Sequence, residues 1–174
     1  MEARVLGRTG LAVSPIGLGL AALGRPGYIN LEHMADLPGD YEIARMEAHA
    51  HAVLDAAWEA GVRYFDAARS YGQAESFLAT WLLKRQIAPG AVTVGSKWGY
   101  RYTAAWRIET PQHEVKDHSL PQLLGQPAES RQLLGPHLGL YQIHSAALDS
   151  GVLADLAVMR ELARFRDSDR RAGP

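Results

Sequence analysis

Cysteine is absent from this chain of 174 residues, and its absence removes several kinds of chemistry at once. Without a thiol there can be no disulfides, no thiolate metal ligands and no cysteine nucleophile. An excess of charge of either sign is also missing, because 18 Lys and Arg against 19 Asp and Glu leave a formal net charge of -1. A nearly neutral chain has no long-range field that attracts polyanions, so we expect neither nucleic acid nor an anionic membrane as a partner.

Long apolar runs are missing as well. No stretch approaches the roughly 20 apolar residues that cross a bilayer, and residues 1–10 lack the apolar segment of a secretory signal. We therefore expect a cytoplasmic protein. Its composition is 47% hydrophobic and 21% charged, which is typical of a globular protein with one core.

Short apolar segments alternate with helical patterns along the chain. A Gly-rich turn between two short apolar segments predicts a β-hairpin over residues 3–14. Apolar runs then predict strands at residues 16–20, 62–66, 91–97 and 138–144, and amphipathic patterns predict helices at residues 42–60, 74–85, 119–134 and 152–165. A Gly- and Pro-rich stretch at 24–41 predicts a loop. Gly125 and Pro127 predict a break in the third helix, because an interior proline costs about 3 kcal/mol.

This order of elements favours an α/β fold with a parallel sheet. A doubly wound sheet would show the same alternation. Its dinucleotide fingerprint is not met, however, because Ala22 stands where the third glycine would follow Gly17 and Gly19. We therefore expect a partial (β/α)8 barrel of about four βα units, preceded by the N-terminal hairpin.

Three of the four predicted strands end in a polar residue, namely Asp66, Lys97 and His144, and Tyr71 lies in the loop after Asp66. The carboxyl ends of barrel strands share one face, so we expect these side chains to meet in one pocket. A tyrosine has a pKa of about 10 and becomes a usable acid when a lysine ammonium stabilises its phenolate. Asp66 would hold Lys97 charged and oriented, and His144 would hydrogen-bond the substrate oxygen beside Tyr71. Such a group can deliver a proton to a substrate oxygen that gains negative charge.

The motifs carrying these residues resemble those of the aldo-keto reductases, a family of nicotinamide-dependent carbonyl reductases built on a (β/α)8 barrel. The matching segments, in family order, are Tyr64-Phe65-Asp66-x-Ala68-x-x-Tyr71-Gly72, Ser96-Lys97 and Gln142-Ile143-His144, with an opening at residues 6–19 that resembles the hairpin closing the bottom of that barrel. The resemblance covers about residues 3–165. It implies an NADP(H)-dependent oxidoreductase acting on a small-molecule aldehyde, ketone or sugar carbonyl, with catalytic residues Asp66, Tyr71, Lys97 and His144.

The resemblance also implies ligand contacts. The cofactor would lie near Asp66 and Ser145, and the substrate near Tyr71 and His144. The aromatic segment after Lys97 adds Trp98 and Tyr100 as candidate walls of the substrate pocket, although such side chains could equally pack against the barrel rim.

No metal site is expected. Two histidines, His49 and His51, are two positions apart on a predicted helix, so they point about 200° apart and cannot share an ion. A second set of candidate ligands lies in a predicted loop, and its spacing matches no known ligand pattern: His113, Glu114, Asp117 and His118. A hydrolase or lyase would need a metal or a second well-placed carboxylate, and only Asp66 qualifies.

A complete (β/α)8 barrel takes about 250 residues, and the family pattern stops after Phe165. We interpret residues 1–166 as an aldo-keto reductase-like half barrel, with βα units over 16–166, and residues 167–174 as a disordered tail after a truncation near residue 167. Most of the family's dinucleotide contacts belong to the other half. The unpaired edges of a half barrel predict a homodimer. A non-catalytic fragment and an accessory or regulatory binding subunit stay open as alternatives.

Overall fold

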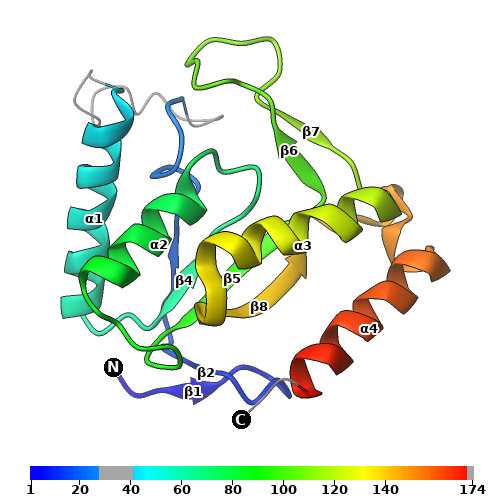
Figure 1. The fold of residues 1–174 in the computed structure, drawn as a ribbon, viewed down its shortest axis with the longest axis horizontal. Helices are drawn as coiled ribbons and strands as arrows, with labels where there is room; N and C mark the ends of the chain where they lie inside the picture. The colour runs from blue at the N-terminus through cyan, green and yellow to red at the C-terminus, as the bar shows by residue number, and fades with distance from the viewer. Residues whose placement is uncertain (28–40, 172–174) are drawn as a thin grey trace.

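A computed structural model of the protein describes residues 1–27 and 41–171 (Figure 1). Most of the predicted loop at 24–41 lies outside the described residues. The strands are β1 (Arg4–Val5), β2 (Ala12–Val13), β3 (Leu18–Gly19), β4 (Tyr64–Asp66), β5 (Thr93–Trp98), β6 (Tyr100–Tyr102), β7 (Glu114–Lys116) and β8 (Leu138–Ile143). The helices are α1 (Ile43–Glu59), α2 (Ala74–Lys84), α3 (Leu120–Leu134) and α4 (Leu156–Arg171).

The central sheet has four parallel strands in the order β3-β4-β5-β8. A helix lies between each pair of neighbouring strands along the chain, and α4 follows the last strand. Strands that are neighbours both in sequence and in space, joined through helices, are the repeating pattern of a (β/α)8 barrel. Figure 1 shows α2 and α3 side by side over one face of this sheet. The predicted α/β fold of about four βα units behind an N-terminal hairpin, β1–β2, is confirmed.

The two faces of the sheet differ in character because successive side chains on a strand point to opposite sides. On the helix side, Phe65 and Val94 are fully buried in a cluster with Leu54, Leu78 and Trp81 of the helices. On the opposite side, Asp66 pairs with Gly95, and Lys97 pairs with Gln142 across the strands. The polar residues predicted for catalysis therefore lie on the face turned away from the helices.

The first two helices begin and end within one residue of the predicted positions. Gly61 follows α1 with a φ of 86°, in the left-handed region where glycine is favoured after a helix. The glycine therefore sets the point at which the chain turns from α1 back towards the sheet.

The expected break in α3 is wrong, because the helix runs without interruption from Leu120 to Leu134 with Pro127 inside it. The packing of this helix explains the difference. Pro127 and its neighbour Gln126 are buried, and the Gln126 side chain accepts from Gly99 N at 2.8 Å and donates to Tyr100 O at 2.9 Å. Tertiary contacts of this kind offset the cost of one missing helical hydrogen bond.

The segment between β5 and α3, expected as an aromatic loop, contains an antiparallel hairpin of β6 and β7. Tyr100 pairs with Lys116 and Tyr102 with Glu114, and the Thr103 amide donates to His113 O at 2.9 Å. Figure 1 shows this hairpin projecting from the sheet at the end where β5 finishes.

Helix α4 begins after a short 3-10 turn at Val152–Ala154 and ends at Arg171. Residues 167–171 are thus helical where the sequence predicts a disordered tail, and residues 172–174 lie outside the described residues. Arginine is a good helix former, so Arg170 and Arg171 are compatible with a helix that continues to this point. The split at residue 166 itself stays a prediction.

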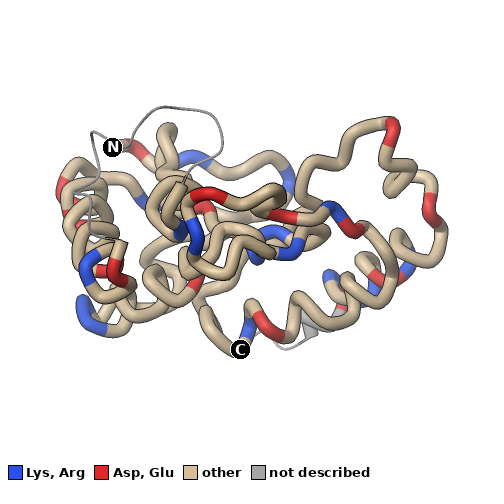
Figure 2. The backbone as a smooth tube through the Cα atoms, turned by 90° about the horizontal axis from the view of Figure 1, so that it is seen from above, with Lys and Arg blue, Asp and Glu red and all other residues tan. Residues whose placement is uncertain are grey.

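Charged residues of both signs are spread along the backbone without a long segment of one sign, as Figure 2 shows. None of the helices in the described part of the chain is long and apolar enough to cross a membrane.

Candidate active site

The four side chains predicted for catalysis meet at the carboxyl ends of the parallel strands. Asp66 ends β4, Lys97 lies near the end of β5, His144 follows β8, and Tyr71 comes from the loop before α2. Lys97 Nζ donates to the Asp66 carboxylate, to Ala67 O at 2.9 Å and to Tyr71 Oη at 3.4 Å. His144 Nε2 lies 3.4 Å from Tyr71 Oη. The phenolic hydroxyl is therefore placed between an ammonium group and an imidazole.

The Lys97–Asp66 ion pair is partly buried, with side-chain exposures of 15% and 23%. Burial and then the negative charge of Asp66 raise the pKa of the neighbouring Tyr64, so that residue stays a neutral phenol. The Oδ1 atom of Asp66 is buried and has no hydrogen-bond partner among the described residues. A Cβ atom added at Gly95 would lie 3.4 Å from this oxygen and 3.3 Å from Tyr64 Oη, close to ordinary contact distances.

The imidazole of His144 is held in its neutral form. Burial, and then the positive charge of Lys97, lower the pKa of His144 to about 4. Its Nδ1 atom lies 3.4 Å from Ser70 Oγ. When that hydroxyl donates to Nδ1, the single ring proton is on Nε2, which faces Tyr71. A neutral imidazole in this tautomer can donate a hydrogen bond to an oxygen atom beside the phenol.

His118 supports the site from outside it, a role that sequence reasoning missed. Its Nε2 lies 2.7 Å from the carbonyl oxygen of His144, and its ring lies 5.7 Å from Trp98 and 6.1 Å from Tyr100, centroid to centroid. Gly99 makes room for it, because a Cβ there would lie 2.2 Å from His118 Cδ2. No sequence motif predicts this contact, because the two segments are far apart in the sequence and meet only in the folded protein.

Arg25 is a second residue that the sequence did not single out. It is 2% exposed, and its Nη1 donates to Ser70 O and to Glu114 Oε2, both at 2.9 Å. Its guanidinium carbon lies 5.7 Å from the centroid of the Tyr71 ring. Arg25 therefore joins the loop carrying Tyr71 to the β6–β7 hairpin. A lone arginine in a Gly- and Pro-rich stretch gives no sequence signal for such a contact.

The structure gives the three other residues predicted to contact ligands different positions. Tyr100 packs on His144, with ring centroids 4.7 Å apart, and is well placed as a wall of the site. Ser145 is exposed directly after His144, with a φ of 49°. Trp98 does not line the site, because it is fully buried with Leu123 in the core of the helix side. As the next residue after Lys97, it points to the opposite face of β5.

The loop residues weighed as metal ligands have other partners. Glu114 pairs with Arg25, Asp117 accepts from the Ser119 amide at 3.1 Å, and His118 lies against the His144 carbonyl. Within residues 1–27 and 41–171, no three His, Cys, Asp or Glu side chains form a group that could hold a metal ion.

A polar pocket of about 340 Å³, partly open to solvent, also lies beside the loop that carries Tyr71. None of the four predicted catalytic residues lines it, and its walls are Arg69, Gly72, Arg101, Tyr102, Gln122, Gln126 and Glu129.

Comparison with known proteins adds to this geometry. Residues 15–168 match a family model described as the Aldo/keto reductase family. Pyridoxal 4-dehydrogenase from Microbacterium luteolum is 31% identical over 165 residues, which cover 82% of this chain and 43% of that protein.

Two solved structures share the fold. A Pseudomonas aeruginosa protein assigned to the aldo-keto reductases gives a TM-score of 0.70 at 26% identity, covering 96% of this chain and 56% of the other. An aldo-keto reductase from Bacillus halodurans, in its holo form, gives a TM-score of 0.66 at 23% identity over 95% of this chain and 47% of the other. The chain thus spans about half the length of the relatives it matches.

Proposed function

The chain belongs to the aldo/keto reductase family, and we propose that it carries the catalytic half of an NADP(H)-dependent oxidoreductase that reduces an aldehyde, ketone or sugar carbonyl. Family membership implies nicotinamide-dependent carbonyl chemistry. The choice of NADP(H) and the role of Tyr71 as general acid are our proposals. The choice of NADP(H) rests on the family resemblance, and one observation carries the role of Tyr71: its Oη lies 3.4 Å from both Lys97 Nζ and His144 Nε2.

The proposed roles follow from these contacts. A bound reduced nicotinamide supplies the hydride. Tyr71 gives the proton of its hydroxyl to the substrate oxygen, and the ammonium of Lys97 stabilises the phenolate that remains. Asp66 holds the Lys97 ammonium in place through their ion pair. His144, neutral because of its lowered pKa, donates from Nε2 to the substrate oxygen and so orients the carbonyl towards Tyr71.

Two features of the chain fit a nicotinamide nucleotide near this site. The buried Oδ1 atom of Asp66 makes no full hydrogen bond among the described residues, although the neighbouring Tyr64 phenol interacts with this carboxylate, so the oxygen can accept a further donor. It suits a hydroxyl donor such as the ribose next to the nicotinamide. The exposed Ser145 adds a second hydroxyl directly after His144.

The substrate is best sought among small aldehydes. The Microbacterium luteolum relative is named for its action on pyridoxal, so pyridoxal is the first substrate to test alongside a simple aromatic aldehyde. The cysteine-free sequence also fits a cytoplasmic protein, which we propose as its location.

The deciding experiment follows NADPH consumption by the purified chain with each aldehyde, with NADH as the comparison and Tyr71→Phe as the matched variant. We expect binding of NADPH, measured by tryptophan quenching, to be the same for both proteins. Turnover should fall by about 100- to 10,000-fold in Tyr71→Phe, the usual contribution of a general acid. Equal turnover in both proteins would refute the role of Tyr71, and no NADPH binding at millimolar concentration would refute the whole proposal.

We further propose that two copies associate through the outer strands of the sheet. Among the described strands, β3 and β8 each pair on one side only. Several large apolar side chains are also exposed, among them Ile16 at 64%, Leu148 at 94% and Leu156 at 68%. Unpaired edges and exposed apolar residues favour association. A monomeric mass by light scattering at micromolar concentration would overturn this proposal.

A further inference from the structure

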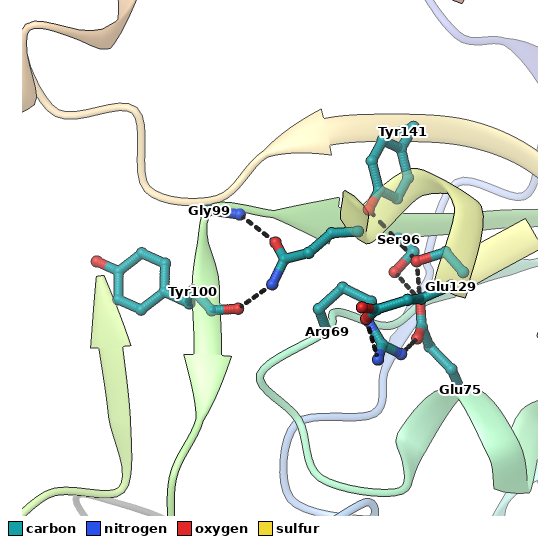
Figure 3. A network of polar contacts seen from close by, with 9 residues as sticks. Arg69, Glu75, Ser96, Gly99, Tyr100, Glu129 and Tyr141 are labelled. Carbon is teal, nitrogen blue, oxygen red and sulfur yellow. Dashed lines mark hydrogen bonds and ion pairs between the residues drawn. The ribbon is translucent and has the colours of Figure 1, made fainter. Parts of the chain in front are cut away.

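Glu75, in the first turn of α2, is a buried carboxylate that the proposed chemistry does not use. The residue is 2% exposed. Its Oε1 atom accepts hydrogen bonds from Ser96 Oγ and Ser130 Oγ, both at 2.6 Å, and its Oε2 atom forms an ion pair with Arg69. Figure 3 shows this network between the sheet and the helices. Both oxygens have partners, as a buried charge requires.

One partner of Glu75 stands directly before a catalytic residue. Ser96 precedes Lys97 on β5, and neighbouring side chains on a strand point to opposite faces. Ser96 is fully buried on the helix side, while Lys97 reaches Asp66 and Tyr71 on the other side. A displacement of Ser96 therefore moves the backbone from which Lys97 projects.

A second partner lies two residues before Tyr71. Arg69 connects the buried Glu75 to the exposed Glu129 of α3, with Nε and Nη2 lying 3.0 and 2.6 Å from Glu129 Oε2. The side chain of Glu75 is 3% exposed and that of Glu129 is 55% exposed. The loop carrying Tyr71 is thus held by one carboxylate shielded from water and by one that water screens.

The network also reaches the strand that leads to His144. Ser130 Oγ lies 3.3 Å from the hydroxyl of Tyr141 on β8, three residues before His144. Burial raises the pKa of Tyr141 far above its ordinary value, so it takes part as a neutral hydroxyl. Glu75 is therefore linked to residues one to three positions before three of the four proposed catalytic residues.

We propose that Glu75 is a positioning residue, which holds Lys97 and Tyr71 at hydrogen-bond distance by anchoring Ser96 and Arg69 on the helix side of the sheet. The distance it maintains is 3.4 Å, near the outer limit of a hydrogen bond, so a small displacement separates the two groups. The catalytic consequence rests on the proposed function. The positioning itself can be measured without substrate or cofactor.

The test compares Glu75→Gln with Glu129→Gln, since each removes one of the two negative charges that face Arg69. For each protein, the titration of Tyr71 is obtained as the difference in tyrosinate absorbance between that protein and its own Tyr71→Phe counterpart. We expect the pKa of Tyr71 to rise by about 1 pH unit in Glu75→Gln, because Lys97 is no longer held against the phenol. The pKa should stay at the wild-type value in Glu129→Gln.

An unchanged Tyr71 titration in folded Glu75→Gln would overturn the inference. If circular dichroism shows that Glu75→Gln does not fold, Ser96→Ala decides the question, because it removes one anchor without leaving a buried charge unpaired. It should raise the pKa of Tyr71 in the same direction but by less, and no rise would likewise overturn the inference.

Activity separates this inference from the proposed function. An active wild-type chain should show a roughly tenfold lower kcat in Glu75→Gln with KM little changed, because no substrate contact is removed. If wild type is inactive while the Tyr71 titration shifts in Glu75→Gln, the positioning role stands and the proposed function fails. If wild type is active and the titration does not shift, the proposed function stands and the positioning role fails.

Discussion

Replacing Lys97 by methionine should change the acid sensitivity of the whole fold through His144. The pKa of His144 is lowered from 6.5 to about 4, by burial first and by the charge of Lys97 second. In Lys97→Met the second cause disappears, and the Asp66 carboxylate, which lies in the same site, loses the cation that neutralises it. Both changes favour the imidazolium, so the pKa of His144 should rise by about 1 pH unit or more.

The effect on stability follows from where protons bind. Between pH 6.5 and about 4, His144 binds a proton in the unfolded chain but stays neutral in the folded chain. The free energy of unfolding therefore falls as the pH falls through this range. At about 1.36 kcal/mol per pH unit the loss has an upper bound of about 3 kcal/mol, and water screening of the partly buried ring reduces it to about 1–2 kcal/mol. Lys97→Met should be less stable at neutral pH, because it leaves Asp66 unpaired, yet it should lose less of its remaining stability on acidification.

The assay is a proton NMR titration of the imidazole C–H signals, with His144→Gln identifying the signal among the seven histidines. Urea unfolding at neutral pH and near pH 4.5 measures the linked change in stability. Lys97→Arg, which keeps the charge, is the control and should leave the pKa of His144 near its wild-type value. A pKa of His144 that stays at about 4 in Lys97→Met would refute the electrostatic coupling inferred from the site.

Two further predictions concern the β5–β6 junction. Gly99→Ala should lower the free energy of unfolding by about 3 kcal/mol, because the new Cβ would lie 2.2 Å from His118 Cδ2 in a backbone with a φ of 103°. Calorimetry measures this loss. Gly125→Ala is the control and should not destabilise the protein, because no atom lies within 4 Å of the added Cβ. Trp98→Phe should lower the melting temperature but leave the KM for any aldehyde unchanged, since Trp98 is fully buried on the helix side. A raised KM together with an unchanged melting temperature would show that Trp98 contacts the substrate after all.

The meeting of the proposed catalytic residues was predictable because it follows from one rule of topology. Parallel strands place their carboxyl ends together, so Asp66, Lys97 and His144 had to meet once the strands were identified. Side chains also alternate between the two faces of a strand, and this places Trp98 on the face opposite to the proposed substrate site. The residue after Lys97 must face the helices, and the period of two was readable from the sequence.

Other features depended on contacts that no local pattern contains. The β6–β7 hairpin pairs Tyr100 with Lys116, and its base is bound by Gln126 of the next helix. The same helix keeps Pro127 in its interior because its surroundings are packed. Arg25 and Glu75 reach the site or its support only after distant segments come together. Secondary-structure propensity describes single segments and does not predict contacts between distant ones.

The β6–β7 hairpin is held in place both at its base and beyond its far end. Gln126 satisfies the backbone groups of Gly99 and Tyr100 at its base. The turn at its far end closes through Thr103 and His113, outside the parallel sheet. Beyond this turn Trp106 packs on Phe77 and its Nε1 donates to Tyr41 O, and Glu114 of the hairpin pairs with Arg25. A change in the hairpin would therefore reach, through Arg25, the loop that carries Tyr71, so the proposed substrate wall at Tyr100 and the proposed acid are linked.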